Sequence, residues 1–401
     1  MTTLFDFPVN RYNTNSYKYD FAAEHGKPEG IIPMWVADMD FLSPPCVKEA
    51  LTKVVNHGLY GYTAEKDGYF HALSNWYRSH FHWDIQKDWL IKTPGVICAI
   101  AAAIRVLTKP GDSILIQPPV YYPFRECIVR NHRIAVESPL VSTENRYEID
   151  FCHFEQQIEN NHVKLFILCS PHNPVGRVWS HEELTKIGEI CLRHNVKIVS
   201  DEIHSDIVFD KRKHTVFASI SPAFAASSIT CTAPSKTFNI AGLHTSNIFI
   251  PNPEIRKAFQ EELLAGRYEG VNLMGLAACE AAYRDGAEWL TQLLTYLGGN
   301  RSFLQNWLKE FLPQIHMAPL EGTYLAWLDF RALNMSDAQL EKFLSFEAKV
   351  WLDTGIAFGH EGSGFMRMNL ACHRSTLQKA LEQITSAINK KNCSPSFSVL
   401  K

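Results

Sequence analysis

Between about residues 90 and 250, short apolar runs alternate with longer stretches of mixed apolar and polar residues. Short apolar runs that end in polar residues are typical of strands in a mostly parallel sheet with helices on both faces. The strands expected from this pattern are Ser113–Gln117, Lys164–Cys169, Lys197–Ser200, Ser228–Thr232 and Asn247–Pro251. One intervening helix is expected at Ser180–His194, because Ser180 and Glu183 have the spacing of a capping box. This region predicts an α/β fold.

The pattern changes after about residue 287, where long helical stretches surround a few strand-like runs. The helices expected there are Glu288–Phe311 and Ser336–Lys349, and the strands are Tyr324–Asp329 and Phe365–Ala371. We therefore expect residues 46–286 to form a large α/β domain and residues 287–401 a smaller α+β domain. Residues 1–45 cannot form a core of their own and are expected to join the small domain or a partner subunit.

Composition and charge narrow the possible functions. The chain has 401 residues, of which 46% are hydrophobic and 20% charged, and its formal net charge is -3. A slightly negative protein does not attract a polyanion electrostatically, so neither nucleic acid nor an anionic membrane is expected as the main partner. The basic run Lys211–Lys213 is interpreted as a solvated loop. Chemistry on a small molecule is the better expectation.

The chain also lacks the signals of a secreted or membrane protein. Its ten cysteines form no Cys-x-x-Cys pair and are expected to be reduced thiols. Residues 1–20 have no cationic start followed by an apolar stretch. The most apolar helical stretch, Val96–Leu107, is too short to span a membrane and is interrupted by Arg105. We therefore expect a cytoplasmic protein.

Three polar residues follow successive expected strands, at the edge where open α/β sheets bind ligands. Lys236 stands alone in the uncharged segment 233–243, and a desolvated lysine amine can attack a carbonyl. Asp201 closes the strand 197–200, and a buried carboxylate there needs a cationic partner such as a protonated pyridine nitrogen. Asn173 lies between two prolines and can donate its side-chain amide to a phenolic oxygen.

Each of these residues also has a plain structural interpretation. The stem of Lys236 could pack while its ammonium group reaches water. Asp201 could cap a helix or bind a metal, although no second His or Cys stands at ligand spacing and no His-Glu-x-x-His occurs, so no metal is expected. Asn173 could simply belong to a turn. It is the succession of Asn, Asp and Lys at three strand ends that favours a shared site.

The motifs around these residues resemble those of fold-type I enzymes that use pyridoxal 5′-phosphate (PLP). The likeness is to the class I and II aminotransferase group, and within it to the cystathionine β-lyase (C-S lyase) branch of the MalY and PatB type. The matching segments are 34–41, 61–63, 93–96, 121–123, 170–179, 201–206, 233–243 and 367–370. They span most of the chain in the order of the family. The resemblance implies a PLP-dependent transferase-like large domain, a smaller α+β domain and a homodimer.

The resemblance also implies a role for each matching residue. Lys236 would form a Schiff base with PLP and move the α-proton, Asp201 would keep the ring nitrogen protonated, and Tyr121 would stack on the ring. The other cofactor contacts implied are Asn173 at the 3-oxygen with His204 nearby, Ile203 on the second ring face, Gly95, Val96 and Ser235 at the phosphate, and Tyr62 from the partner subunit. The substrate contacts implied are Arg367 at the carboxylate, Tyr122, Ala37 and Asn173.

Three positions depart from the pattern of the family. His244 stands where related aminotransferases commonly have an arginine for the phosphate, and Ala233 stands where they tend to have a serine. These two departures put the phosphate contacts in question. The third departure, Tyr19 in place of a tryptophan between Lys18 and Asp20, is mild.

The function implied by the resemblance is α,β-elimination of L-cystathionine, L-cysteine or related S-substituted cysteines to pyruvate, ammonia and a thiol. An aminotransferase is the nearest alternative, because the same Lys, Asp, Asn and Arg set can carry out either reaction. A second activity as a regulatory interaction protein that modulates a transcription factor stays open. A nicotinamide dehydrogenase is disfavoured, since no Gly-x-Gly-x-x-Gly follows an early strand.

Overall fold

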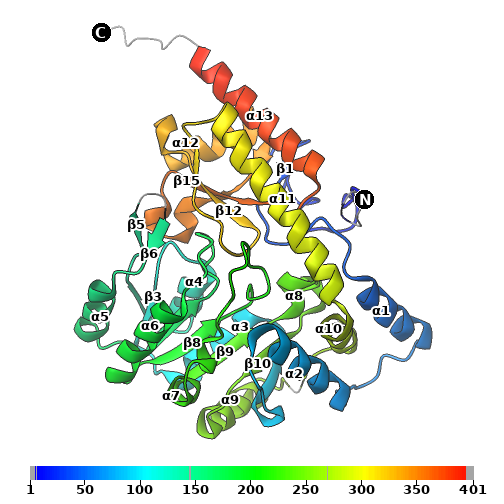
Figure 1. Ribbon diagram of the computed structural model, residues 1–401, viewed down its shortest axis with the longest axis vertical. Coiled ribbons are helices and arrows are strands. Elements are labelled where there is room, and N and C mark those ends of the chain that lie inside the picture. Colours follow the sequence, from blue (N-terminus) through cyan, green and yellow to red (C-terminus); the bar gives the residue numbers. More distant parts are fainter. Residues whose placement is uncertain (1–4, 6, 144–145, 269, 394–401) are drawn as a thin grey trace.

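A seven-stranded sheet, a four-stranded sheet, two two-stranded sheets and their helices make up the protein. They are seen in a computed structural model that describes residues 5, 7–143, 146–268 and 270–393. In Figure 1 the larger sheet and its helices lie in the lower part, and the smaller sheet lies above with the long helices α11 (Ala287–Phe311) and α13 (Arg374–Cys393). The described part of the chain contains no helix long and apolar enough to cross a membrane.

The larger sheet has seven strands in the spatial order β2-β10-β9-β8-β7-β3-β4. Their bounds are β2 Leu90–Thr93, β3 Ser113–Ile116, β4 Ile134–Glu137, β7 Leu165–Cys169, β8 Lys197–Asp201, β9 Ser228–Thr232 and β10 Ser246–Phe249. Neighbouring strands from β9 to β4 run parallel, whereas β10 is antiparallel to both β9 and β2. The carboxyl ends of β7, β8 and β9 therefore lie at one edge of the sheet.

Alternation along the strands divides the core of this sheet between its two faces. In β7, Leu165 and Ile167 belong to the apolar cluster that includes α3 (Val96–Leu107), α4 (Pro123–Arg130) and α9 (Pro253–Ala265). Phe166 and Leu168 belong to the cluster on the other face, with α5 (Phe151–Asn160) and α6 (His181–Arg193). Successive side chains of a strand point to opposite faces, so a continuous apolar run such as β7 predicts burial on both.

The smaller sheet has the order β11-β12-β15-β14 and is antiparallel at each pairing. Its strands are β11 His316–Met317, β12 Leu325–Asp329, β14 Asp353–Thr354 and β15 Phe365–Asn369. The short strand β1 (Ile32–Pro33) pairs with β13 (Val350–Trp351), so the N-terminal segment contacts the C-terminal region of the same chain. The remaining elements are α1 Pro45–His57, α2 Asp67–Phe81, β5 Val141–Thr143, β6 Arg146–Glu148, α7 Pro222–Ser227, α8 Pro234–Thr237, α10 Leu273–Asp285 and α12 Asp337–Lys342.

The mostly parallel α/β fold predicted from the sequence is confirmed. The five predicted strands of the larger sheet are present, β9 with the predicted bounds and the other four with ends shifted by one or two residues. Ser180 caps α6 in a capping box with Glu183, as its spacing predicted. The helix predicted at Ser336–Lys349 is wrong in part, because α12 ends at Lys342 and a π-helical turn, Phe343–Glu347, follows. The wider turn buries Phe343 and Leu344, a tertiary packing effect that helical periodicity does not show.

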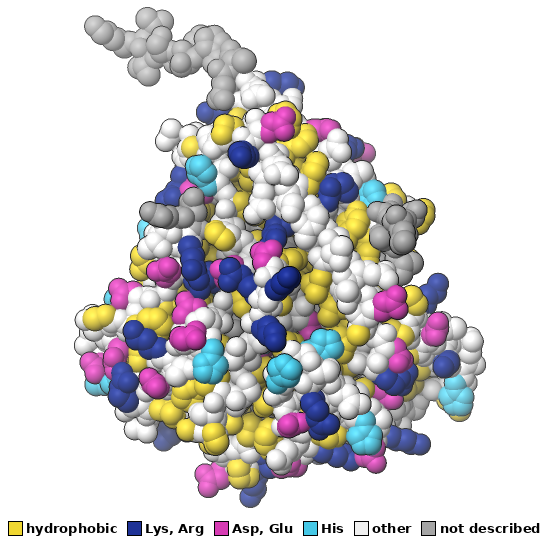
Figure 2. Space-filling model, in the orientation of Figure 1, with side chains coloured by type: hydrophobic (Ala, Val, Ile, Leu, Met, Phe, Trp, Pro, Cys, Tyr) yellow, Lys and Arg dark blue, Asp and Glu magenta, His cyan; other side chains and the backbone are white. Residues whose placement is uncertain are grey.

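The surface carries both signs of charge. Figure 2 shows Lys and Arg side chains interspersed with Asp and Glu over one face of the protein. The run Lys211–Lys213 is exposed, as predicted for a solvated loop. The nine cysteines whose side chains the structure describes form no disulfide.

Candidate active site

The ends of three parallel strands bring the predicted residues together. Cys169, Asp201 and Cys231 lie side by side across β7, β8 and β9 in the register of the sheet. The chain continues from β7 to Asn173 and from β9 to Lys236 on α8. Both residues and Asp201 line one cavity of about 350 Å³, called here the strand-end cavity. The predicted residues that line it are Ala37, Gly95, Val96, Tyr121, Asn173, Asp201, Ile203, His204, Ser235 and Lys236.

Asp201 is a buried carboxyl group that faces the strand-end cavity. Its Oδ1 accepts a hydrogen bond from the backbone N–H of Ile203 at 3.1 Å. Among the described residues, no Lys, Arg or His side chain forms an ion pair with it. Burial raises the pKa of Asp201 to about 7, against the opposing effects of the Ile203 hydrogen bond and the charge of Lys236. A cationic group in the cavity would remove this cost of burial.

Lys236 presents its amine to the same cavity. Its Nζ donates a hydrogen bond to the backbone carbonyl of Ala37 at 2.6 Å, and Tyr324 Oη donates to that carbonyl at 2.8 Å. Burial lowers the pKa of Lys236 to about 8; the charge of Arg367 lowers it further, and those of Asp38 and Asp201 oppose the decrease. A larger fraction of this amine is therefore uncharged at neutral pH than of an exposed lysine amine.

Asn173 links the strand-end cavity to Arg367 of the smaller sheet. Arg367 Nη1 donates to Asn173 Oδ1 at 3.0 Å, and Nη2 donates to Trp35 O at 3.1 Å and to Asp353 Oδ2 at 2.6 Å. The buried Nε of Arg367 has no hydrogen-bond partner. Arg367 does not itself line the cavity, but its guanidinium group is fixed beside it with one N–H group unused.

His204 and Tyr121 add two buried rings to the cavity wall. Burial lowers the pKa of His204 well below its usual value, with the charges of Lys236 and Arg367 acting in the same direction, so its imidazole is neutral. Its Nδ1 is buried without a hydrogen-bond partner. Burial raises the pKa of Tyr121, so its phenol is also neutral. Ile203 lines the same cavity and supplies apolar surface.

The N-terminus of α3 opens into the strand-end cavity at Gly95 and Val96. A side-chain Cβ at Gly95 would have no neighbouring atom within 4 Å, so open space lies beside this backbone. Ser235, His244 and Thr245 line the same cavity. Backbone N–H groups at a helix N-terminus, together with hydroxyl groups, suit an anion such as a phosphate.

Besides Arg367, two predicted residues lie outside the cavity lining. Tyr62 is fully exposed, with a relative exposure of 113%, in the extended segment between α1 and α2. Tyr122 is half-buried and packs against Tyr121 and Phe358, with ring centroids 5.4 and 5.6 Å away. The structure of one chain therefore brings neither residue to the cavity wall.

Sequence reasoning missed several residues of the site. Cys169 and Thr245 line the strand-end cavity, Tyr324 fixes the Ala37 carbonyl, and Asp353 pairs with Arg367. Cys169 ends a predicted strand and could have been placed at the edge on that signal. Asp353 and Tyr324 are brought in by the smaller sheet, and no local pattern marks them.

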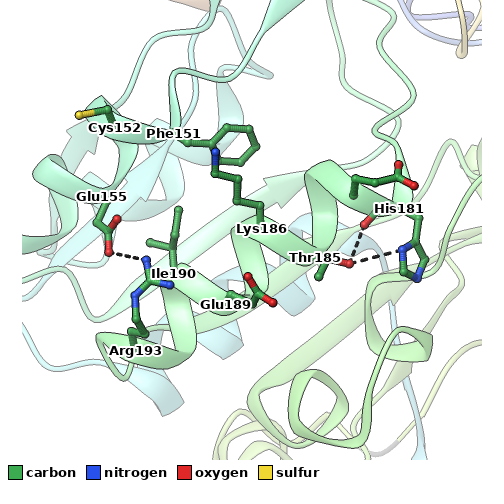
Figure 3. A pocket seen from close by; sticks show the side chains of 10 residues that line it. Phe151, Cys152, Glu155, His181, Thr185, Lys186, Glu189, Ile190 and Arg193 are labelled. Atoms are coloured by element: carbon green, nitrogen blue, oxygen red, sulfur yellow. Dashed lines mark hydrogen bonds and ion pairs between the residues drawn. The ribbon is translucent and has the colours of Figure 1, made fainter.

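A second hollow of about 640 Å³ lies between α5 and α6 (Figure 3). In this hollow Arg193 is bonded to Glu155 at 2.6 Å, and Lys186 is placed over the Phe151 ring at 4.3 Å. Thr185 bonds to the backbone of His181. This hollow has no buried, unpaired polar group of the kind found at Asp201 or His204 among its lining residues.

The chain belongs to the class I and II aminotransferase family, whose profile matches residues 30–384. It is 42% identical to cystathionine beta-lyase PatB of Bacillus subtilis (strain 168), over 96% of this chain and 100% of that protein. It is 33% identical to protein MalY of Escherichia coli (strain K12), over 96% of this chain and 99% of that protein. The resemblance predicted from the motifs is thereby confirmed.

The fold matches as well. Cystalysin from Treponema denticola, whose crystal structure contains a pyridoxal 5′-phosphate cofactor, superimposes with a TM-score of 0.94 at 39% identity. The match covers 98% of this chain and 100% of that one.

Proposed function

We propose that the protein is a PLP-dependent carbon–sulfur lyase. It catalyses α,β-elimination of L-cystathionine, L-cysteine or other S-substituted cysteines. One water enters, and pyruvate, ammonia and a thiol leave. The observation that carries this proposal is the buried, unpaired Asp201 in the same cavity as the Lys236 amine, in a chain similar to PatB over nearly its whole length.

The residues of the strand-end cavity fit PLP. Asp201 offers an anionic partner for a protonated pyridine nitrogen, which is the cation that the carboxylate lacks among the described residues. The Nδ2 of Asn173 and the ring nitrogen of His204 are available to the phenolic oxygen, since no hydrogen bond of Asn173 Nδ2 or His204 Nδ1 is formed within the described chain. Tyr121 and Ile203 supply surfaces for the two ring faces.

The phosphate of the cofactor is assigned to the start of α3. Gly95 and Val96 contribute backbone N–H groups there, and Ser235 contributes a hydroxyl group. His244 takes the place of the arginine common in related enzymes, and Thr245 adds a second hydroxyl group. Ala233 supplies no hydroxyl group, so Ser235 and Thr245 are the side-chain hydroxyl donors of this arrangement.

When bound, PLP supplies an electron sink that stabilises the charge left on the substrate Cα as its proton is removed. Lys236 would hold the cofactor, and its free amine would take that proton at Nζ. Its lowered pKa favours the free amine that proton removal requires. The Ala37 carbonyl, 2.6 Å from Nζ, holds the amine in place and accepts a hydrogen bond from the ammonium that results.

Arg367 holds the α-carboxylate of the substrate. Asn173, Trp35 and Asp353 fix the plane of the guanidinium group, and the unused Nε–H remains for the substrate. Ala37 lines the strand-end cavity, and Tyr122, which packs against Tyr121 beside it, is proposed to contact the substrate. A thiolate is a good leaving group, so breaking the Cβ–S bond needs little acid assistance.

The working unit is a homodimer. An apolar hollow of about 900 Å³ runs along α1, and the neighbouring Leu42, Val55, Leu59 and Tyr60 are exposed. Apolar surface of this extent is typical of an interface, and a second copy of the chain is its occupant. Tyr62 continues this surface and reaches the partner's cofactor.

The domain boundaries at residues 45 and 286, and a cytoplasmic location, remain part of this proposal.

The test of the reaction uses L-cystathionine without any keto acid. A lyase produces pyruvate, ammonia and homocysteine in equal amounts over many turnovers, because elimination returns the cofactor unchanged. An aminotransferase stops after about one turnover, since the amino group stays on the cofactor. Product formation that ends at one equivalent per active site would replace the lyase by the aminotransferase alternative. A regulatory second activity would leave either outcome unchanged.

Replacing Arg367 by lysine is expected to lower kcat/KM roughly thirtyfold, because lysine cannot reproduce the planar set of N–H groups. This corresponds to a loss of about 2 kcal/mol in transition-state stabilisation. Cofactor content, measured by absorbance, should stay at the wild-type level. Asp353→Asn is the graded comparison: it keeps Arg367 and an oxygen acceptor for Nη2 but removes the paired charge, so it should lower kcat/KM by less than Arg367→Lys does. Loss of cofactor with unchanged substrate kinetics in the remaining holoenzyme would assign Arg367 to phosphate binding or folding instead.

A further inference from the structure

Residues 34–41, called here the crossing segment, run from β1 to α1 past the strand-end cavity. Side chains bind the backbone of this segment at nearly every residue. Asn369 Nδ2 donates to Val36 O and to Asp38 O, each at 2.6 Å. Asn239 bonds to the N–H of Met39 at 3.0 Å and to the carbonyls of Met39 and Phe41. The Ala37 carbonyl between these anchors is the acceptor for Lys236.

The two carboxylates of the crossing segment bind cations from the N-terminal region. Arg11 bonds to both oxygens of Asp38, at 2.9 and 2.6 Å, and to Asp40 at 2.8 Å. Lys18 Nζ donates to Asp40 at 3.0 Å, and Tyr19 Oη donates to the second Asp40 oxygen at 2.8 Å. We call Arg11, Lys18, Tyr19, Asp38 and Asp40 the Arg11 clamp.

The Arg11 clamp is balanced in charge and partly shielded from water. It contains two cations and two carboxylates; the side chains of Lys18 and Asp40 are 1% and 8% exposed, and those of Arg11 and Asp38 are 19% and 23% exposed. A shielded ion pair of this kind loses far more when one partner is removed than a surface pair does. Residues 7–31 contain no helix or strand, so these charges tie an otherwise irregular stretch to the crossing segment.

Asp38 and Asp40 differ in what lies on their other side. Asp38 follows Ala37 directly, and its negative charge is one of the three that act on the Lys236 amine, with Asp201 and Arg367. Asp40 is two residues further along. Its negative charge raises the pKa values of Tyr12, Tyr19 and Cys372. The other titratable groups near the amine, His204 and Tyr324, are neutral.

We propose that Asp38, oriented by Arg11, is a positioning residue for Lys236: it places the Ala37 carbonyl against the amine and supplies a fixed negative charge beside it. The N-terminal region thus acts on the proposed catalytic lysine although none of the described residues before Ala37 lines the strand-end cavity. This inference rests on the proposed role of Lys236. The positive charge of Arg11 partly neutralises Asp38 and so weakens its effect on the amine. Removing Asp38 should therefore lower the pKa of Lys236, whereas removing Arg11 should raise it.

The test measures the Lys236 amine directly, in the full-length protein freed of cofactor. Competitive acetylation with acetic anhydride at a series of pH values, read by peptide mass spectrometry, gives the titration of this one lysine. Asp38→Asn removes the negative charge, so the fraction of free amine at pH 7 should rise about threefold. Asp40→Asn, the matched control, removes a carboxylate from the same clamp and should produce no rise.

A general loosening of the clamp would expose Lys236 to water and lower its free fraction in both variants. An unchanged or lowered fraction in Asp38→Asn, or an equal rise in both variants, would overturn the proposal. If Asp38→Asn does not fold, Arg11→Gln keeps the test decisive, because an unneutralised Asp38 should lower the free fraction, and no change or a rise would contradict this. The measurement needs neither cofactor nor substrate, so its failure is distinct from failure of the lyase assignment.

Discussion

Replacement of Lys236 by alanine is expected to lower the elimination rate by about a thousandfold to ten-thousandfold. The variant loses both the covalent attachment of the cofactor and the base that removes the α-proton, and the loss of a positioned base alone is worth up to about ten-thousandfold. In the wild-type protein, borohydride reduction followed by peptide mapping should place a pyridoxyl mass on Lys236. The variant should give no such peptide, although PLP can still bind through Asp201, Asn173 and the start of α3.

Lys186 offers a matched control for this experiment. It is also a lysine near a hollow, but it lies in the second hollow over the Phe151 ring (Figure 3). Lys186→Ala should keep wild-type activity and wild-type labelling of Lys236. A pyridoxyl mass on another lysine in the wild-type protein, or substantial turnover by Lys236→Ala, would contradict the assignment.

Replacement of Asp201 by alanine is expected to slow turnover by roughly a hundredfold or more, because the charge partner of the cofactor ring is lost. Asp201→Asn removes the same charge at nearly constant volume, so it should be slowed similarly. Both variants should still carry the pyridoxyl label on Lys236 after borohydride reduction, which separates loss of the electron sink from loss of the cofactor. Near-normal turnover in Asp201→Asn would mean that the carboxyl group has only a structural role.

The raised pKa of Asp201 leads us to expect a pH dependence of stability in the cofactor-free protein. The pKa of Asp201 is raised from 3.8 to about 7 by burial, so between these values the folded chain binds a proton that the unfolded chain does not. The contribution of Asp201 to stability therefore falls as the pH rises from about 4 to 7. Asp201→Asn should remove this part of the slope in chemical unfolding. Bound PLP should also remove it, since a cationic partner favours the ionised carboxylate.

Much of the larger sheet could be read from local pattern. The apolar runs at 164–169, 197–200 and 228–232 are buried on both faces, which is typical of parallel strands. The pattern therefore predicted the strands, their parallel orientation and the edge at which a ligand binds. Asn173, Asp201 and Lys236 were placed at one edge for that reason, and the structure gathers them in one cavity. The antiparallel setting of β10 was not predicted, because a short apolar run does not reveal its direction.

The remaining features of the site depend on contacts between distant segments. Asp353 and Arg367 meet across β14 and β15, and Tyr324 reaches the Ala37 carbonyl from the end of another strand. No spacing along the chain encodes such contacts. For Tyr62 the sequence predicts a role that the structure of one chain does not test, since that role requires a second chain.

Because β10 runs antiparallel to β9, the chain leaves the sheet and re-enters it at the same edge. A parallel β10 would have required a crossover to the far edge, and the residues just before it would lie away from the site. Instead Ser235 and Lys236 at the start of the connection and His244 and Thr245 at its end line the same cavity. The middle of the same loop, at Asn239, Ile240, Gly242 and Leu243, lines the apolar hollow along α1. One connection therefore joins the lysine and the proposed phosphate contacts to the proposed dimer interface, so an insertion at Gly242 should alter the interface and the strand-end cavity together.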